Sequence, residues 1–245
     1  MNNNLVFLIK GELQRLHKYR ITLVSFLIAL VWFLLLYFID DIGLLSTMLP
    51  MIIFIDATMM SVIFIGSILF FEKSEQTIST LLVTPTSVNV QILSKVIGNT
   101  IQMFISTLLI VLVFYVVKQV EVNWLYLVIS LIISIMFHSL LGFIFSFHSK
   151  DFTSMLLGVM MYTFILTIPT LLHQLDIFFK GEIWGYILLI TPANAAYELI
   201  NAAFSSEITL STILALISLT TLGILGYIYY IRPKYKYYSL KHGGL

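Results

Sequence analysis

The stretch that decides the fold is an apolar run at residues 21–39, which read ITLVSFLIALVWFLLLYFI. A helix of about 20 apolar residues crosses a bilayer core. In lipid only helices and closed barrels satisfy every backbone polar group, and this run lacks the alternation of a barrel strand. We therefore predict an all-α polytopic membrane protein, a single domain over residues 1–245. The sequence predicts six transmembrane helices, at about 21–39, 47–71, 97–117, 124–147, 153–172 and 210–231.

The composition supports this fold class. Of 245 residues, 60% are hydrophobic and only 10% are charged, which excludes an ordinary soluble domain. The chain has no cysteine, so a disulfide framework and thiol chemistry are excluded. No cleavage site of the A-x-A type follows the first apolar run, which we expect to be a retained membrane span.

The positions of Lys and Arg predict the orientation. Positively charged residues are enriched in cytoplasmic loops. With a cytoplasmic N-terminus, eleven of the thirteen Lys and Arg residues are inside and two, Lys118 and Lys180, are outside. We therefore expect both termini in the cytoplasm of a bacterial cell, with the chain crossing the cell membrane repeatedly.

A seventh apolar stretch, 183–204, is not counted as a span. Pro192 interrupts it, as do the polar residues Asn194, Glu198 and Asn201. A crossing here would also move the basic C-terminus outside. We predict a pair of short outer helices that re-enter the membrane. Glu198 and Asn201 could gate an exit there, but we expect them to be surface residues.

Residues 5–20 form an amphipathic pattern before the first span. Leucines and isoleucines share one face and basic residues the other, the pattern of a helix lying in the inner membrane interface. Glu12 falls on the apolar face, which the pattern does not explain. Two alternatives stay open: an anchoring helix with one acid reaching the interface, or a contact with a partner.

The inner segment between the second and third spans is EKSEQTISTLLVTP, residues 72–85. We predict a short helix at about 74–84 with an apolar patch at i, i+3 and i+4. Pro85 ends it, because the residue before proline avoids the helical region. Ser87 can then cap the following helix, as Asp151 can cap the fifth span. The apolar patch fits either the membrane surface or a groove in a soluble partner.

This segment resembles the signature of type-2 ABC export permeases, roughly E-x-x-E-G-T-[IL]-x-x-L-L-x-[TS]-P. Thirteen of the fourteen positions are compatible, and Gln76 replaces the usual glycine. The resemblance covers the whole chain, including the N-terminal helix, the six spans and the outer helices. Residues 5–20, 71–95 and 137–169 are most similar to fluoroquinolone-export-like permeases of Gram-positive bacteria.

The resemblance implies a permease subunit that exports an amphipathic drug-like molecule or peptide. Two copies of a separate ABC ATPase would bind ATP and Mg²⁺, so this chain would be no enzyme and hold no cofactor or metal. The second permease chain would be a copy of this chain or a paralogue. The other expected partner is the lipid bilayer, and no binding of nucleic acid is expected. The residues implied to couple transport to the ATPase are Glu72, Glu75, Thr77, Ile78, Leu81, Leu82 and Pro85.

Candidate residues for the transport pathway are the polar or adaptable side chains within spans. Asp56 is the only acid within a span, where a charge is costly. It either binds a cationic substrate group or tunes an outer gate, or it has a structural role. In the structural alternative it is protonated, hydrogen-bonded between helices or placed just under the headgroups. A stripe of small and polar residues at four-residue spacing in the fourth span favours helix packing or lines a pathway. The candidate pathway residues are Asp56, Met60, Gln102, Ser134 and His138, and the candidate outer gate residues are Asn194 and Glu198.

Several chemistries have no motif in this sequence. It contains no G-x-x-x-x-G-K-[ST] loop and no H-E-x-x-H. One alternative to the transporter subunit is a stand-alone immunity or channel protein without an ATPase, which would not need the segment 72–85. Another is a proton-coupled carrier, which would need more intramembrane ionisable groups than Asp56 and His138.

Overall fold

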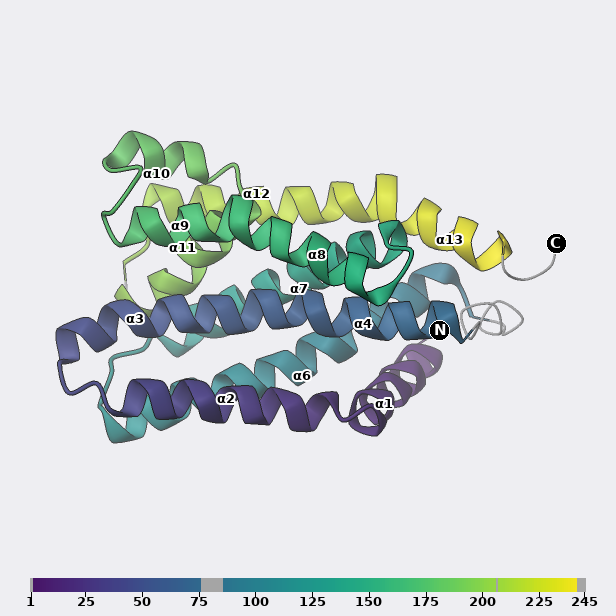
Figure 1. The fold of residues 1–245 in the computed structure, drawn as a ribbon, viewed down its shortest axis with the longest axis horizontal. Helices are drawn as coiled ribbons and strands as arrows, with labels where there is room; N and C mark the ends of the chain where they lie inside the picture. Colours follow the sequence, from purple (N-terminus) through teal and green to yellow (C-terminus); the bar gives the residue numbers. More distant parts are fainter. Residues whose placement is uncertain (1, 76–85, 206, 242–245) are drawn as a thin grey trace.

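The structure, a computed structural model, describes residues 2–75, 86–205 and 207–241, and these are helices joined by short connections (Figure 1). The long helices run side by side, α1 crosses one end of the bundle and α10 lies at the other. In chain order the elements are α1 (Asn2–Lys18), α2 (Ile21–Tyr37), α3 (Ile42–Ile55), η1 (Asp56–Met60), α4 (Ser61–Ser74), α6 (Val88–Val117), α7 (Trp124–His148), α8 (Phe152–Tyr162), η2 (Thr163–Thr167), α9 (Ile168–Gln174), α10 (Glu182–Leu188), α11 (Pro192–Ser205), α12 (Leu210–Gly226), η3 (Tyr227–Ile231) and α13 (Arg232–Lys241). Elements labelled η are π-helical turns within longer helices.

The membrane character of the chain is evident in the length and composition of its helices. Five continuous helices in the described residues are long and apolar enough to span a membrane, and up to seven if each of two bent pairs is one span. The bent pairs are α1 with α2, at 66°, and α10 with α11, at 115°. The chain is therefore an all-helical polytopic membrane protein by these criteria, and the count of six spans stays a prediction.

The N-terminal bend separates an amphipathic helix from an apolar one. The helix α1 ends at Lys18, two residues before the predicted boundary, and α2 begins at Ile21. Between them Arg20 has φ 62°, in the left-handed region, which ends the helical course of α1. The apolar helix can thus run along the bundle while α1 crosses its end (Figure 1).

The second span is longer than predicted. Residues 40–46, which lie between the first two predicted spans, are largely helical. The reason is that the side chain of Asp41 accepts hydrogen bonds from the backbone of the first turn, so that α3 begins at Ile42. The helix then continues through η1 to Ser74, so Ser74 ends this span rather than beginning a separate helix. The predicted caps Ser87 and Asp151 are confirmed, each accepting a backbone N–H at the N-terminus of its helix.

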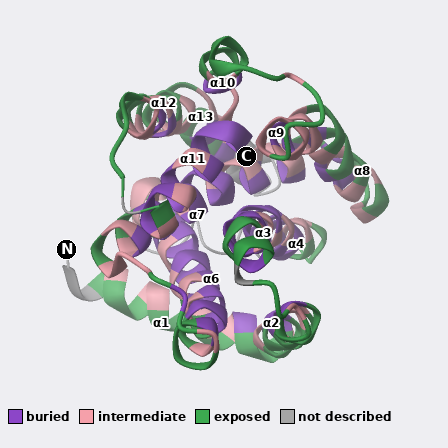
Figure 2. Cartoon of the chain, turned by 90° about the vertical axis from the view of Figure 1, so that its left-hand side faces the viewer, coloured by how far each residue is buried: buried purple, intermediate pink, exposed green. Residues whose placement is uncertain are grey.

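The second span lies at the centre of the molecule. Of the most apolar part of this span, 83% of the residues are buried. The corresponding share for the last span, Leu210–Tyr237, is 11%. Buried residues concentrate in α3, α4, α6, α7 and α11. The outward faces of α2 and α10 are exposed (Figure 2). Packing is close at Gly142 of α7, where an added Cβ would lie 2.3 Å from Cγ2 of Ile65. The glycine allows α7 and α4 to approach closely, in agreement with the packing alternative for the small-residue stripe.

Candidate functional site

Four charged side chains from three helices meet at the end of the bundle that α1 crosses. Nζ of Lys95 on α6 donates to Oε1 of Glu12 on α1, at 2.9 Å, and to Oε1 of Glu72 on α4, at 2.5 Å. Nη1 of Arg15 donates to both carboxylate oxygens of Glu12, at 3.3 Å, and pairs with Glu72. Glu12, Glu72 and Lys95 are at most 6% exposed. We call these four residues the charge cluster.

The charge cluster explains the acid on the apolar face of α1. That face packs on the bundle, where Leu16 is fully buried, so a carboxylate at position 12 points inward as well. Gly98 of α6 makes room for it, since an added Cβ there would lie 3.0 Å from Cβ of Glu12. Inside the bundle the carboxylate reaches Lys95. Neither alternative stated for Glu12 was an intramolecular contact, and this is what the structure shows: its carboxylate pairs with Lys95 and Arg15 of the same chain.

The environment keeps Glu12 ionised. Burial raises the pKa of its carboxyl, but the charges of Lys95 and Arg15 and their hydrogen bonds lower it by more, so that the pKa lies below its usual value. A buried carboxylate is stable only when it is paired and hydrogen-bonded. Each member of the charge cluster therefore depends on the others.

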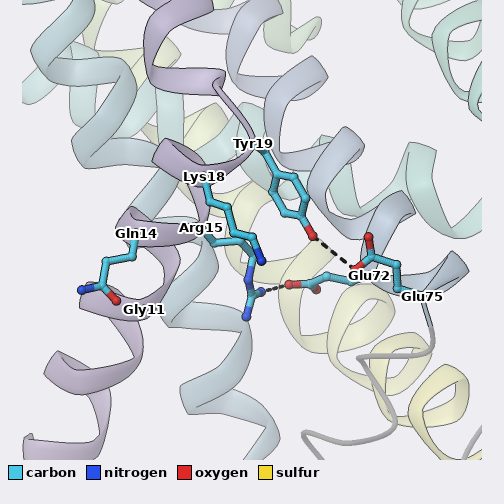
Figure 3. A pocket seen from close by; sticks show the side chains of 7 residues that line it. All are labelled: Gly11, Gln14, Arg15, Lys18, Tyr19, Glu72 and Glu75. Carbon is cyan, nitrogen blue, oxygen red and sulfur yellow. Dashed lines mark hydrogen bonds and ion pairs between the residues drawn. The ribbon is translucent and has the colours of Figure 1, made fainter.

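A pocket of about 350 Å³ lies beside the charge cluster, between α1 and the end of α4 (Figure 3). Tyr19 and Glu75 form one side of it, and the Tyr19 hydroxyl donates to Oε2 of Glu75 at 3.2 Å. Arg15 and Lys18 point toward the acids from the α1 side (Figure 3). The lining of the pocket therefore carries both signs of charge, from Arg15 and Lys18 on one side and Glu72 and Glu75 on the other.

The charge cluster adjoins the segment with the coupling motif. Glu72 and Glu75 stand at its N-terminal side, and Lys95 stands in the third turn of the helix that follows it. The predicted helix at about 74–84 lies mostly outside the described residues. The predicted coupling residues that lie outside them are Thr77, Ile78, Leu81, Leu82 and Pro85.

The candidate pathway residue Asp56 is buried in the second span, as part of the π-helical turn η1. Its Oδ2 accepts a hydrogen bond from the Thr107 hydroxyl of α6 at 2.9 Å. Met60, at the other end of η1, is partly buried. The sulfur of Met59 between them accepts from the Thr163 hydroxyl of η2 at 3.2 Å, so two π-helical turns face each other here. Such turns often occur at functional sites.

Gln102 and His138 are engaged in contacts between helices, whereas the Ser134 hydroxyl is buried and has no hydrogen-bond partner among the described residues. Gln102 accepts from the Thr22 hydroxyl and donates to the Ser25 hydroxyl, which joins α6 to α2. His138 is fully buried, with Nδ1 2.8 Å from the backbone oxygen of Ser134 and Nε2 3.0 Å from the Tyr162 hydroxyl. Within the described ranges no hydrogen bond or ion pair joins Asp56 to His138. The five candidates therefore do not form one cluster.

The candidate gate residues lie on α11, at the opposite end of the bundle. Asn194 is fully buried, and Gln174 at the end of α9 donates to its Oδ1 at 3.4 Å and to Oε1 of Glu198 at 3.2 Å. The Ser211 hydroxyl of α12 donates to Glu198 at 3.4 Å. Glu198 and Asn201, which we expected at the surface, are partly buried, because α11 packs against its neighbours.

A second polar group in the membrane region was missed at the sequence level. Nδ2 of Asn99 on α6 donates to the Ser61 and Ser139 hydroxyls, at 3.0 and 2.8 Å, which joins α4, α6 and α7. Lys95 was counted only as an inner charge. The sequence feature that could have identified Lys95 and Asn99 is their spacing. They are four residues apart, in the N-terminal half of a helix that is otherwise mostly apolar.

The described residues contain no group of three or more His, Cys, Asp or Glu side chains that could hold a metal ion. In comparisons with known proteins, no family model and no curated protein matches this chain.

Proposed function

We propose that this chain is the permease subunit of an ATP-driven exporter of the type-2 ABC class, with six spans and cytoplasmic termini. The observation that carries the proposal is the motif at residues 72–85, next to a buried charge cluster that ties both of its flanking helices to α1. In this proposal a separate ATPase subunit binds the segment 72–85. The substrate is an amphipathic small molecule or peptide, since few charges occur in the spans.

The charge cluster supports a mechanical role for this end of the molecule. Glu72 lies in the last turn of α4 and Lys95 in the third turn of α6, and both pair with the same helix α1. A displacement of the segment between them would therefore act on α4, α6 and α1 together, because a buried ion pair resists separation. The second span is the most buried of the five, so its movement would displace the helices that pack against it.

The proposal is tested by purifying the tagged chain from its native membrane in mild detergent and identifying bound proteins by mass spectrometry. A stoichiometric P-loop ATPase is expected. The double variant Glu75→Lys, Leu81→Asp should lose the ATPase while inserting in the membrane in normal amounts. Glu121→Lys, an exposed charge reversal in the connection between α6 and α7, is the matched control.

The opposite result would favour a stand-alone immunity or channel protein. If no ATPase is recovered under conditions that preserve a control ABC complex, the exporter proposal fails. An ATPase that stays bound to the double variant would reject the segment 72–85 as its docking site.

The substrate side of the proposal centres on Asp56. We expect Asp56→Asn to alter export of cationic substrates more than of neutral ones, because a buried carboxylate favours a cation. Export assays with one substrate of each kind make this comparison. Equal export of both by the variant would assign Asp56 a structural role, with its hydrogen bond to Thr107 as the reason for its presence.

A further inference from the structure

An apolar groove runs along the outside of the bundle between α6, α7 and α12. It has a volume of about 380 Å³, and its lining includes Ile92, Phe137, Gly223 and Tyr227. Ile224 and Ile228, also in the lining, are 59% and 45% exposed, so the groove opens sideways. On a helix that spans a membrane, this opening faces the lipid.

One mouth of the groove is polar and basic. The Tyr227 hydroxyl donates to Oδ1 of Asn89, in the first turn of α6, at 3.1 Å. Arg232 follows Ile228 by four residues and Tyr227 by five across the π-helical turn η3, so it continues the same side of the helix. It is exposed, and within the described ranges it forms no ion pair.

We propose that this groove binds an anionic phospholipid, with one acyl chain in the groove and the phosphate at Arg232. The lining accepts a hydrocarbon chain, and the exposed Arg232 supplies charge complementary to the headgroup. Basic residues just beyond a membrane helix attract anionic lipids. This proposal is independent of the exporter function.

The size of the groove favours a lipid chain over a helix of a second copy. A helix is about 10–12 Å in diameter and rises about 5.4 Å per turn. Two turns would therefore occupy at least twice the volume of the groove. An extended hydrocarbon chain is much thinner and can enter between the side chains of α6 and α12.

Native mass spectrometry of the full chain released from nanodiscs of equal phosphatidylglycerol and phosphatidylcholine tests the proposal. The unmodified chain should retain one phosphatidylglycerol, preferred about fivefold for one basic contact. Gly223→Leu should retain neither lipid, because its side chain enters the groove: a Cβ there already lies 3.4 Å from Phe137. Gly226→Leu is the matched control, since nothing lies within 4 Å of a Cβ at that position.

A second variant tests the headgroup without changing the groove. Arg232→Gln should still retain a lipid but lose the fivefold preference, whereas Lys150→Gln, which removes an exposed charge from the turn between α7 and α8, should keep it. The proposal is overturned if the unmodified chain retains no lipid, if the preference survives Arg232→Gln, or if Gly223→Leu releases a second copy of the chain instead of a lipid. Because Arg232 is exposed, its variant remains informative if Gly223→Leu does not fold.

Discussion

At the end of the bundle that α1 crosses, three buried charged side chains and the partly exposed Arg15 form one cluster, whereas the opposite end is held by weaker contacts around α9 and α11. In the charge cluster the contacts of Lys95 are 2.5–2.9 Å long, and every member is ionic. Around Glu198 the hydrogen bonds come from Gln174 and Ser211, at 3.2–3.4 Å. At the α1 end the ion pairs depend on one another, whereas at the α11 end each hydrogen bond can be replaced separately.

The difference has an energetic consequence. Removing one partner of a buried ion pair costs about 3–5 kcal/mol, because the other charge is left uncompensated. A neutral hydrogen bond contributes about 0.5–1.5 kcal/mol. The α1 end should therefore move as one unit, and the α11 end should tolerate substitutions. In the proposed exporter, the α1 end is the one that would receive force from the ATPase.

The largest effect is expected for Lys95→Met. This variant leaves the buried Glu12 and Glu72 with Arg15 as their remaining partner in the charge cluster, and the free energy of unfolding should fall by about 3–5 kcal/mol. Unfolding in mild detergent measures the change. Lys10→Met, on the exposed face of α1, is the control and should cost about 0.5 kcal/mol or less. Equal losses in the two variants would mean that the buried Lys95 contributes no more to stability than an exposed lysine of the same end.

The next effect concerns the interdependence of the cluster. Glu12→Leu combined with Lys95→Met should be more stable than the sum of the single variants predicts, by about 0.5–3 kcal/mol, because the double change leaves fewer uncompensated charges. A double-mutant cycle on the same unfolding assay gives this number. Strict additivity would mean that Glu12 and Lys95 do not interact energetically despite their 2.9 Å contact.

A smaller effect is expected from pH. Because the folded pKa of Glu12 lies below its unfolded value, its pairing stabilises the protein above about pH 4.3 and is lost as pH falls through the folded pKa. The stability difference between the unmodified chain and Glu12→Gln should therefore shrink below about pH 4.3. Unfolding midpoints between about pH 3 and 7 measure it. A constant difference over this range would contradict the assignment of an ionised Glu12.

The smallest effect is expected at the opposite end. Glu198→Gln keeps an acceptor for Gln174 and loses at most the charge contribution, so the unfolding free energy should change by about 1 kcal/mol or less. The exposed Glu207→Gln is its control. A loss above about 3 kcal/mol would mean that the α11 end depends on a buried charge as the α1 end does.

The parts of the fold that follow from local chemistry could be predicted. The apolar runs gave the approximate position of the long helices, and the caps at Ser87 and Asp151 follow from side chains that accept backbone N–H groups nearby. The start of the second span was misplaced, because Asp41 was assigned to a loop instead of a cap. For the coupling motif, Glu72 and Glu75 are described, and the rest of it lies outside the described residues.

The sequence by itself determined the class of protein: apolar length forces helices that can span a bilayer, since backbone groups must be satisfied within lipid. Only the tertiary structure decided what Glu12 and Lys95 do. They are 83 residues apart, and their contact depends on how α1 packs across α6 at Gly98. Periodicity places a side chain on a face of its own helix but does not say which charge it meets on another helix. That choice is made by packing.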